Sequence, residues 1–500
     1  MELSGSTPHP LVHNPLRRPG TPRNSDKTTQ ESYETNTDKG FEAILNQNIS
    51  LVTTASVCRR WRSAAINSGN LWSKIALDAS DSCTITRAEL FFERSRSAPL
   101  TVYIIDYEDQ SSMLPRVQSV VARIAAASER IAQCVLFANS PTLWSYWTHS
   151  APNAHTIVIG GSGGMDVPLF GTELTQLREF VSFFYPVLPP SGLQHLTFLK
   201  IHNDGKTVSL DSLLDVLRQS INLKILSLGG FGRWLLTNNT PTTPVSLPNA
   251  RDLTLTSCDS ATFLHHTHLP PPAGIYIIGQ PRAGGILSAL PEGFSSVAVL
   301  PDLDKLSVVF TPGQPFCVSA GNRTGWKVSI EGEGYTRSLV GSSLDAVIQF
   351  PPFSTIRTLY FASWATIPGW VQQILNLRCL QNLQVEYTEP DELLVALHSS
   401  GTQTGLPALQ VLEDLGLHRC YPPGRINPTS LKTLLKSRRF PQLKTISLHE
   451  DVCQEMKGLD VGSTWANLLV LKGMFLRLNP LIGAKLVTRT KQIIFVLWRG

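Results

Sequence analysis

The chain of 500 residues is 42% hydrophobic and 16% charged, with a formal net charge of +5. Such a length can bury a large core, and it predicts either several ordinary domains or one long array of repeats. A weak positive charge spread over a whole chain is not the pattern of a nucleic-acid-binding surface, so we expect no nucleic-acid partner.

Localisation is indicated by three further features of the sequence. The N-terminus lacks the apolar core of a signal peptide, and no apolar run reaches the ~18 residues of a transmembrane helix. The eight cysteines are scattered and form no C-x-x-C pair, which argues against a zinc ribbon or a redox motif. We therefore expect a cytoplasmic or nuclear protein that is not secreted and does not contact a membrane.

The first elements along the chain are a tail and a small helical module. Residues 1–38 are rich in Pro, Ser, Thr and Asn and lack apolar periodicity, which predicts a disordered tail. Residues 39–80 are expected to form the module. Within it, Val57, Trp61, Ala64 and Ala65 are spaced as one apolar face of a helix, with arginines on the other faces.

A turn and an apolar anchor follow that helix. Gly69 suits a left-handed helix C-cap, and Leu71 and Trp72 can then fold back on Trp61. We expect Val57, Trp61, Leu71 and Trp72 to carry the integrity of the module. The candidate residues for its core or for partner binding are Val57, Trp61, Arg62, Leu71, Trp72 and Ile75.

The order of these residues resembles the second half of an F-box, specifically that of the F-box-like proteins expanded in fungi. The matching positions are Val57, Cys58, Trp61, Arg62, Leu71, Trp72 and Ile75. A second stretch, LFFERSRSAPLTVYI at residues 90–104, is similar to the segment that follows the F-box in that family. Without that stretch, VCRRWR would also suit an ordinary buried helix with a solvated basic face.

The resemblance implies a module that binds the Skp-type adaptor of a cullin–RING ubiquitin ligase. The first half of an F-box is incomplete in this chain. Phe41, Ile44 and Leu45 stand where its first helix would be, but the usual Leu-Pro-x-Glu turn is absent. The alternative is therefore a repeat protein without functional adaptor binding.

Residues 81–475 repeat a short apolar-x-x-apolar-x-apolar template. Its clearest copies begin at Leu223, Ala250, Leu380, Leu412 and Leu443. Weaker copies begin at Ile131, Ala154, Leu177, Leu196, Ala273, Leu303, Gly325, Ile356 and Ala466. The copies lie roughly 20–30 residues apart, which is the period of a leucine-rich repeat.

This periodicity predicts an α/β fold. We expect a leucine-rich-repeat-like, right-handed solenoid with a curved parallel sheet inside and helices outside, each unit burying its apolar side against its neighbours. The amphipathic stretch 210–223 is one of the expected helices, and others are expected after Gly369 and after Ser430. A pair of globular α/β domains is the alternative. Residues 476–500 contain the β-prone IIFVLW and form either a C-terminal cap or a tail.

The sequence offers no pattern typical of catalysis. The Gly-rich 160–164 lacks the spacing of a phosphate-binding loop, and His265, His266 and His268 have no supporting ligand cluster. We therefore expect no catalytic residues, no cofactor and no metal, although a cleft that gathers titratable groups would favour an enzyme. The resemblance to the F-box-like family then implies a non-enzymatic protein that recruits an unidentified target to a Skp/cullin-type ubiquitin ligase, with the adaptor bound by the module and the target by the repeats.

Overall fold

The computed structural model describes most of the chain between residues 25 and 449, together with 492–496. The described residues are 25–106, 115–161, 169–171, 174–184, 192–203, 208–231, 234–235, 244–270, 273–279, 289–290, 303–311, 315–322, 327–332, 347, 355–363, 367, 369–386, 390–399, 409, 411–418, 430, 434, 442–443, 445–449 and 492–496. For a few of these, including 25–37 and 492–496, only the backbone is described.

The described part of the chain folds as a mixed α/β protein around one large, mostly parallel sheet of 17 strands, which does not close into a barrel. The strands are, in chain order, β1 (Lys74–Asp78), β2 (Leu100–Asp106), β3 (Ile131–Ala138), β4 (Thr156–Gly160), β5 (Glu179–Ser182), β6 (Phe198–His202), β8 (Ile225–Gly229), β11 (Asp252–Thr256), β13 (Gly274–Gly279), β14 (Lys305–Phe310), β15 (Phe316–Gly321), β16 (Lys327–Gly332), β17 (Thr358–Ser363), β18 (Asn382–Glu386), β19 (Asp414–His418), β20 (Thr445–His449) and β21 (Gln492–Val496).

Neighbouring strands follow the chain with one exception. Their spatial order is β1–β2–β3–β4–β5–β6–β8–β11–β13–β16–β15–β14–β17–β18–β19–β20–β21. All adjacent pairs are parallel except those made by β15 and by β21. The exception is the meander β14–β15–β16, which is inserted in reverse order between β13 and β17.

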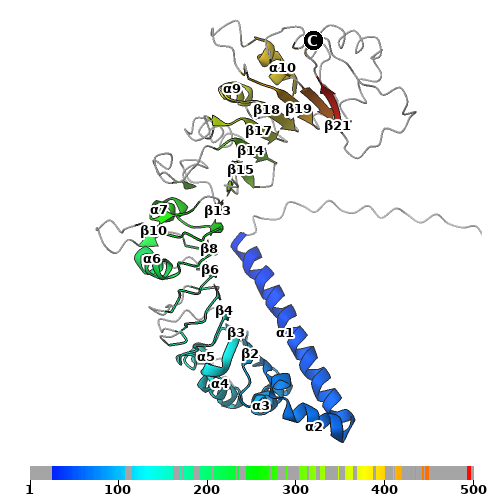
Figure 1. The fold of residues 1–500 in the computed structure, drawn as a ribbon, viewed down its shortest axis with the longest axis vertical. Coiled ribbons are helices and arrows are strands. Elements are labelled where there is room, and N and C mark those ends of the chain that lie inside the picture. Colours follow the sequence, from blue (N-terminus) through cyan, green and yellow to red (C-terminus); the bar gives the residue numbers. More distant parts are fainter. Residues whose placement is uncertain are drawn as a thin grey trace, which may run out of the picture.

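Most helices cover one face of this sheet, which is the convex face in Figure 1. The helical elements are α1 (Ser25–Val57), α2 (Arg59–Asn67), η1 (Gly69–Trp72), α3 (Ser82–Ser95), α4 (Pro115–Ala126), η2 (Ser128–Arg130), α5 (Pro141–Trp144), α6 (Leu210–Gln219), α7 (Ser260–His265), α9 (Trp370–Leu375) and α10 (Pro390–Ser399). Two short pairs, β7 (Val208–Ser209) with β9 (Trp234–Leu235) and β10 (Val245–Ser246) with β12 (Thr267–His268), lie outside the sheet.

Every copy of the apolar template up to Leu443 leads into a strand of the sheet. The copy at Leu223 shows why. The Leu223 amide donates to the Ser220 carbonyl at 3.0 Å, which closes a turn and buries the leucine, and the alternating Leu226 and Leu228 then face the helix-covered core. The next amide, that of Lys224, donates to Thr197 O of the preceding unit at 2.8 Å. The same bond recurs between successive units, so each strand is aligned with the one before it. The copy at Ala466 lies outside the described residues.

The predicted helix at 210–223 is confirmed as α6. Ser209 is its N-cap, with the hydroxyl accepting a bond from the Ser212 amide at 3.5 Å, and Leu210, Leu213 and Leu217 are buried against the sheet. The helix expected after Gly369 is also present, as α9. The one expected after Ser430 lies almost wholly outside the described residues.

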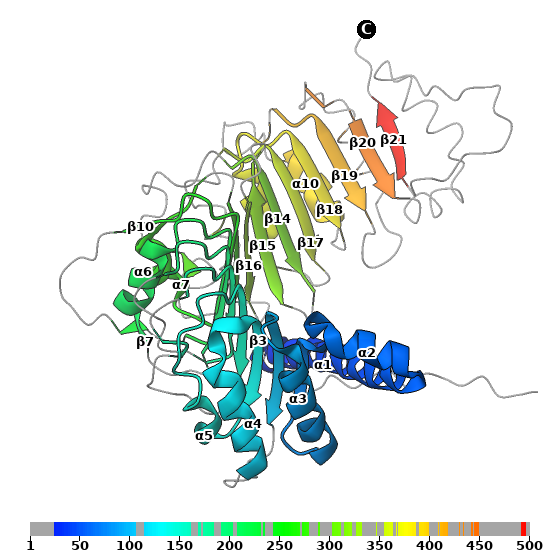
Figure 2. The same cartoon turned by 60° about the horizontal axis from the view of Figure 1, so that its bottom comes forward.

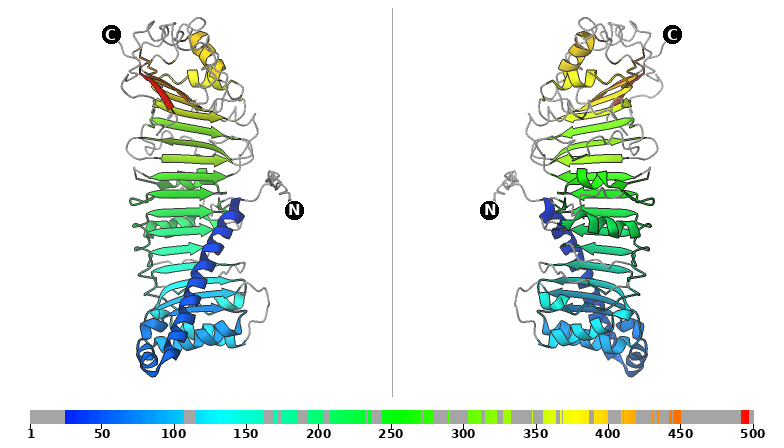
Figure 3. Two further views of the ribbon diagram at one scale, coloured as in Figure 1. Left: turned by 90° about the vertical axis from the view of Figure 1, so that its right-hand side faces the viewer. Right: turned by 90° about the vertical axis from the view of Figure 1, so that its left-hand side faces the viewer.

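The expected N-terminal tail is partly a helix. The structure extends α1 back to Ser25, so the boundary at residue 38 is corrected for residues 25–38, while 1–24 are not described. No proline interrupts this stretch, so a helix can continue through it. In Figures 1 and 3, α1 crosses the concave face of the sheet, opposite the face covered by α4, α5 and α6.

Described side chains attach the middle of α1 to the first two strands. Phe41 and Ile44 are buried against Ala76 of β1 and Ile105 of β2. The Asn48 side-chain amide donates to Lys74 O at 3.1 Å. The residues expected to form a worn first F-box helix are thus helical, but they pack against the sheet.

The C-terminal piece supplies an edge strand. Residues 492–496 form β21, which pairs antiparallel with β20, as a cap would. Within the described part of the chain, no helix has both the length and the apolar character needed to cross a bilayer.

Candidate protein-docking module

The helical module is divided in two at Cys58. This residue is extended, with φ −152° and ψ 163°, and its Sγ accepts a bond from the Trp61 amide at 3.5 Å as the N-cap of α2. Val57 therefore ends α1 and does not share a helix with Trp61. The single face predicted for Val57, Trp61 and Ala65 is incorrect, because the cap changes the direction of the chain between them.

Gly69 is required for a reason other than the one predicted. Ser68 is the C-cap of α2, with φ −107°, and Gly69 opens η1 without a left-handed conformation. A Cβ on Gly69 would lie 2.7 Å from the carbonyl oxygen of Ser95. A side chain at this position would therefore collide with the backbone at the end of α3.

Trp72 is the centre of the module. Its side chain is fully buried, and its indole Nε1 donates to Ala65 O at 2.7 Å. The ring meets Phe91 edge-on with centroids 4.9 Å apart, and the Arg94 guanidinium lies 4.4 Å from its centroid. Phe91 and Arg94 belong to the second matching stretch, so Trp72 joins the two stretches that carry the family resemblance.

Arg130, which precedes β3, ties the middle of the second stretch in place. Its guanidinium donates to Ser95 Oγ at 2.7 Å and to Ala98 O at 3.1 Å. Hydrogen bonds from a charged donor to a buried or half-buried acceptor are among the stronger hydrogen bonds of a fold. The turn between α3 and β2 is therefore anchored from a neighbouring unit.

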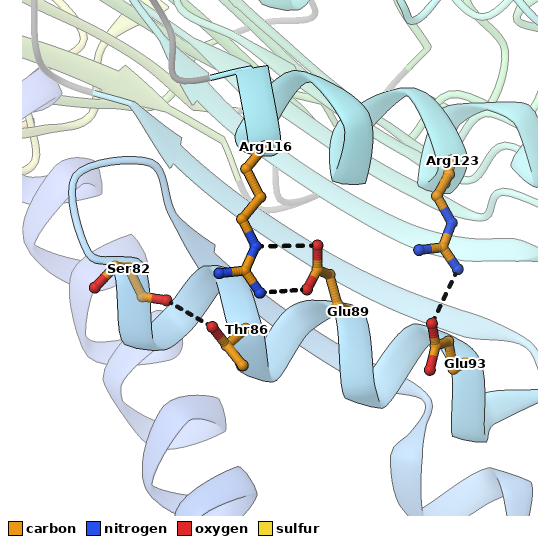
Figure 4. Close-up of polar contacts among 6 residues, drawn as sticks. All are labelled: Ser82, Thr86, Glu89, Glu93, Arg116 and Arg123. Atoms are coloured by element: carbon orange, nitrogen blue, oxygen red, sulfur yellow. Dashed lines mark hydrogen bonds and ion pairs between the residues drawn. The ribbon is translucent and has the colours of Figure 1, made fainter.

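Two ion pairs join α3 to α4 on the outer surface, as Figure 4 shows. Arg116 meets Glu89 at 2.6 Å and Arg123 meets Glu93 at 3.4 Å. The hydrogen bond from Arg116 holds the pKa of Glu89 below its ordinary value. In the same view, the Thr86 hydroxyl donates to the Ser82 carbonyl within α3.

The six predicted residues separate into a core group and a surface group. Trp72 and Ile75 are fully buried. Val57, Trp61 and Leu71 remain 71%, 57% and 48% exposed. Arg62 is exposed and donates from Nε to Ala55 O at 3.2 Å, which links α2 to α1. Of the four residues expected to carry the integrity of the module, Trp72 alone is buried, and it folds back on Ala65 instead of Trp61.

Exposed apolar side chains are concentrated in this module. Five of the eight large hydrophobic residues that are exposed in the described part of the chain are Ile49, Val52, Val57, Trp61 and Leu71. Arg59, Arg60 and Arg62, which are close to Trp61 in the sequence, are also exposed. The sequence reasoning missed Ile49 and Val52, although they are apolar positions that the buried face of α1 does not use. We call Val57, Trp61 and Leu71 the apolar platform.

The histidine tract and the Gly-rich stretch of the sequence both lie outside the module. The rings of His265 and His266 pack edge to face, and among the described residues no three His, Cys, Asp or Glu side chains gather to hold a metal ion. Gly160 leaves room for the ring of Phe137, and Gly161 has a φ of 126°, so this part of the Gly-rich stretch serves a turn. Residues 162–164 lie outside the described part.

A comparison with protein-family models finds no match for the chain, and no curated protein matches it.

Proposed function

We propose that the chain is a non-enzymatic interaction protein in which an F-box-like module binds a Skp-type adaptor and the large sheet recruits a target for a cullin–RING ubiquitin ligase. The observation that carries the proposal is the apolar platform. Its three large apolar side chains come from one short stretch of sequence and are all exposed, and aromatic residues with neighbouring arginines are typical of protein interfaces.

The contacts of Trp72 support the F-box-like assignment. The two stretches that resemble the fungal family are distant in sequence, yet Trp72 contacts Phe91 and Arg94 directly. Trp72 of the first stretch and Phe91 and Arg94 of the second are thus in direct contact, while the exposed platform would face the adaptor.

The repeated units support the second half of the proposal, a leucine-rich-repeat-like solenoid. Successive template copies lead into successive parallel strands, with helices on the outer face (Figure 2). Such arrays present extended concave surfaces for protein binding. Target recruitment by this face would explain a chain in which no catalytic constellation is predicted.

The decisive experiment is a binding measurement with a purified Skp-type adaptor and the full chain. The W61A/L71A double variant should weaken adaptor binding by about tenfold or more, because exposed aromatic anchors dominate interface energies. Its thermal unfolding should stay close to that of the parent, since both side chains are about half exposed and neither belongs to the buried core.

A matched control is available outside the module. Ile221 is 52% exposed, so I221A removes a comparable apolar side chain elsewhere and should leave adaptor binding unchanged. Absence of adaptor binding by the folded parent protein would refute the adaptor half of the proposal.

One observation favours a second candidate, a repeat protein without adaptor binding. Phe41 and Ile44, which would form the first F-box helix, are occupied by contacts with Ala76 and Ile105 of the sheet. In that case the apolar platform would bind a different protein. A protein captured by the parent but not by W61A/L71A would be identified as that partner.

A further inference from the structure

The concave face of the sheet carries buried apolar side chains of its own, although the main core lies on the opposite face. Val135 and Phe137 of β3 alternate with residues of the helix-covered core, so they face away from it. They form a separate cluster with Val181 of β5 and Phe183. We call Val135, Phe137, Val181 and Phe183 the concave patch. None of the four is more than 6% exposed.

Burial on the concave face changes along the sheet. One row of residues in register on this face consists of Val135, Val158, Val181, Lys200, Ser227, Thr254 and Tyr276. From β3 to β6 three of its four members are buried, whereas from β8 to β13 all three are only partly buried. Removal from water also lowers the pKa of Lys200. The concave face is therefore covered between β3 and β6.

Among the described elements, α1 is the one that Figures 1 and 3 place over these strands. Its residues Phe41 and Ile44 dock on Ala76 of β1 and Ile105 of β2. Tyr103 of β2 packs against both this contact and the concave patch. From there the helix runs toward its N-terminal end, which lies near the level of β8 in the same figures. The N-terminal part of α1 therefore crosses β3 to β6.

This N-terminal part of α1 is a poor match for an apolar surface. Residues 25–37, which we call the polar cover, read SDKTTQESYETNT, and Tyr33 is the only hydrophobic residue among them. Positions 30, 34 and 37 lie on the helical face of Phe41 and are Gln, Glu and Thr. Polar groups placed against apolar atoms gain little free energy and lose contacts with water. The polar cover is therefore docked weakly, although its length of about 20 Å is enough to span β3 to β6.

We infer that the polar cover is displaceable and that the concave patch binds an apolar helical segment of the target protein in its place. Such a segment buries apolar atoms against Phe137 and Phe183, which the polar cover does with Tyr33 at most. Because cover and target compete for one surface, the apparent affinity for the target depends on the fraction of molecules in which the cover is open. The inference rests on the proposed recruitment of a target by the sheet and names the chemistry of the recruited segment.

The test uses the full chain and two fluorescent synthetic peptides based on residues 25–37. The apolar peptide carries the changes Q30L, E34L and T37L, which create an apolar helical face. The control peptide carries E34Q alone, so both peptides have the same net charge. We expect the apolar peptide to bind at least about tenfold more tightly than the control peptide, because it alone matches the concave patch. Fluorescence anisotropy measures both affinities.

Variants of the full chain separate the cover from the patch. Q30P/T35P interrupts the helix of the polar cover outside the core and should bind the apolar peptide about threefold or more tightly than the parent, because no cover has to be displaced. V181S should weaken binding by about fivefold or more. The matched control is V309S, since Val309 of β14 lies on the same face beyond the N-terminal end of α1 and is partly buried. It should leave binding unchanged, and circular dichroism checks that both valine variants are folded.

Three results would overturn the inference: equal binding of the two peptides, equal binding of the apolar peptide by Q30P/T35P and the parent, or equal effects of V181S and V309S. W61A/L71A should bind the apolar peptide like the parent, because none of the platform residues belongs to the concave patch. Loss of peptide binding in W61A/L71A would assign the peptide to the apolar platform and also overturn the inference. Peptide binding at the patch without adaptor binding would refute the adaptor half of the proposed function and leave this inference standing.

Discussion

Trp61 and Trp72 come from the same short motif, yet one is a surface residue and the other is the centre of a core. The difference is set by the backbone between them. Cys58 ends one helix and begins the next, so that Trp61 is left on an outer face, whereas η1 turns Trp72 back toward Ala65, Phe91 and Arg94. The comparison teaches that a motif can combine residues that hold a module together with residues that are free to contact a partner.

The largest expected effect is the difference in stability between variants of the two tryptophans. W72A should lower the free energy of unfolding of the unit that contains it by about 3–5 kcal/mol, because it removes a fully buried aromatic side chain. W61A should change it by no more than about 0.5 kcal/mol. Chemical denaturation followed by circular dichroism would measure both, and similar losses in the two variants would contradict the comparison.

A smaller effect should come from the glycine between them. G69A places a Cβ 2.7 Å from Ser95 O, a backbone atom that cannot move aside easily, and should cost about 1–3 kcal/mol. The matched control is G279A, where a Cβ would meet nothing within 4 Å. Thermal unfolding of the two variants gives the measurement, and a neutral G69A would show that α3 can shift away from η1.

The concave face offers a pH-dependent contrast to the module. Burial lowers the pKa of Lys200 in β6 to about 8, from an ordinary value of 10.5. The unfolded chain then binds more protons than the folded one between about pH 8 and 10.5, so this residue makes stability rise with pH across that window. Denaturation of K200M and of the parent as a function of pH would test this prediction. The parent alone should show the rise in stability with pH that Lys200 causes.

The smallest effect should be at the solvent-exposed ion pair between α3 and α4. Replacing Glu89 with Gln removes its partner for Arg116 but leaves the Trp72 contacts intact. Since the pKa of Glu89 is lowered in the folded state, its contribution is present above the ordinary carboxyl pKa and disappears as pH falls. The midpoint of thermal unfolding should shift slightly at low salt and not at all at 1 M salt, about the level that screens exposed charges.

The strands were predictable because apolar residues that become buried alternate with other residues in their sequences. Each template copy marks a buried turn residue and two core-facing strand residues, as Leu223, Leu226 and Leu228 illustrate. No predicted template copy leads into β15, and the pairing of β16 with β13 depends on contacts that no local pattern records.

The candidate site was predictable only in outline. The residues of the motif were identified, but the burial of Trp72 and the exposure of Trp61 depend on the break at Cys58 and on packing against α3. The close approach of Ser95 O to Gly69 links two stretches that are distant in sequence, so glycine was expected there for its backbone freedom and is instead required by tertiary contact.

The reversed meander also has a consequence for how the protein is made on the ribosome. β13 leaves the ribosome early, but its neighbour β16 is synthesised only after β14 and β15. Until Gly332 has emerged, one edge of the nascent sheet stays without its native partner, and open edges promote aggregation. The edge at β13 therefore stays open for longer than that of a strand whose partner is the next strand along the chain.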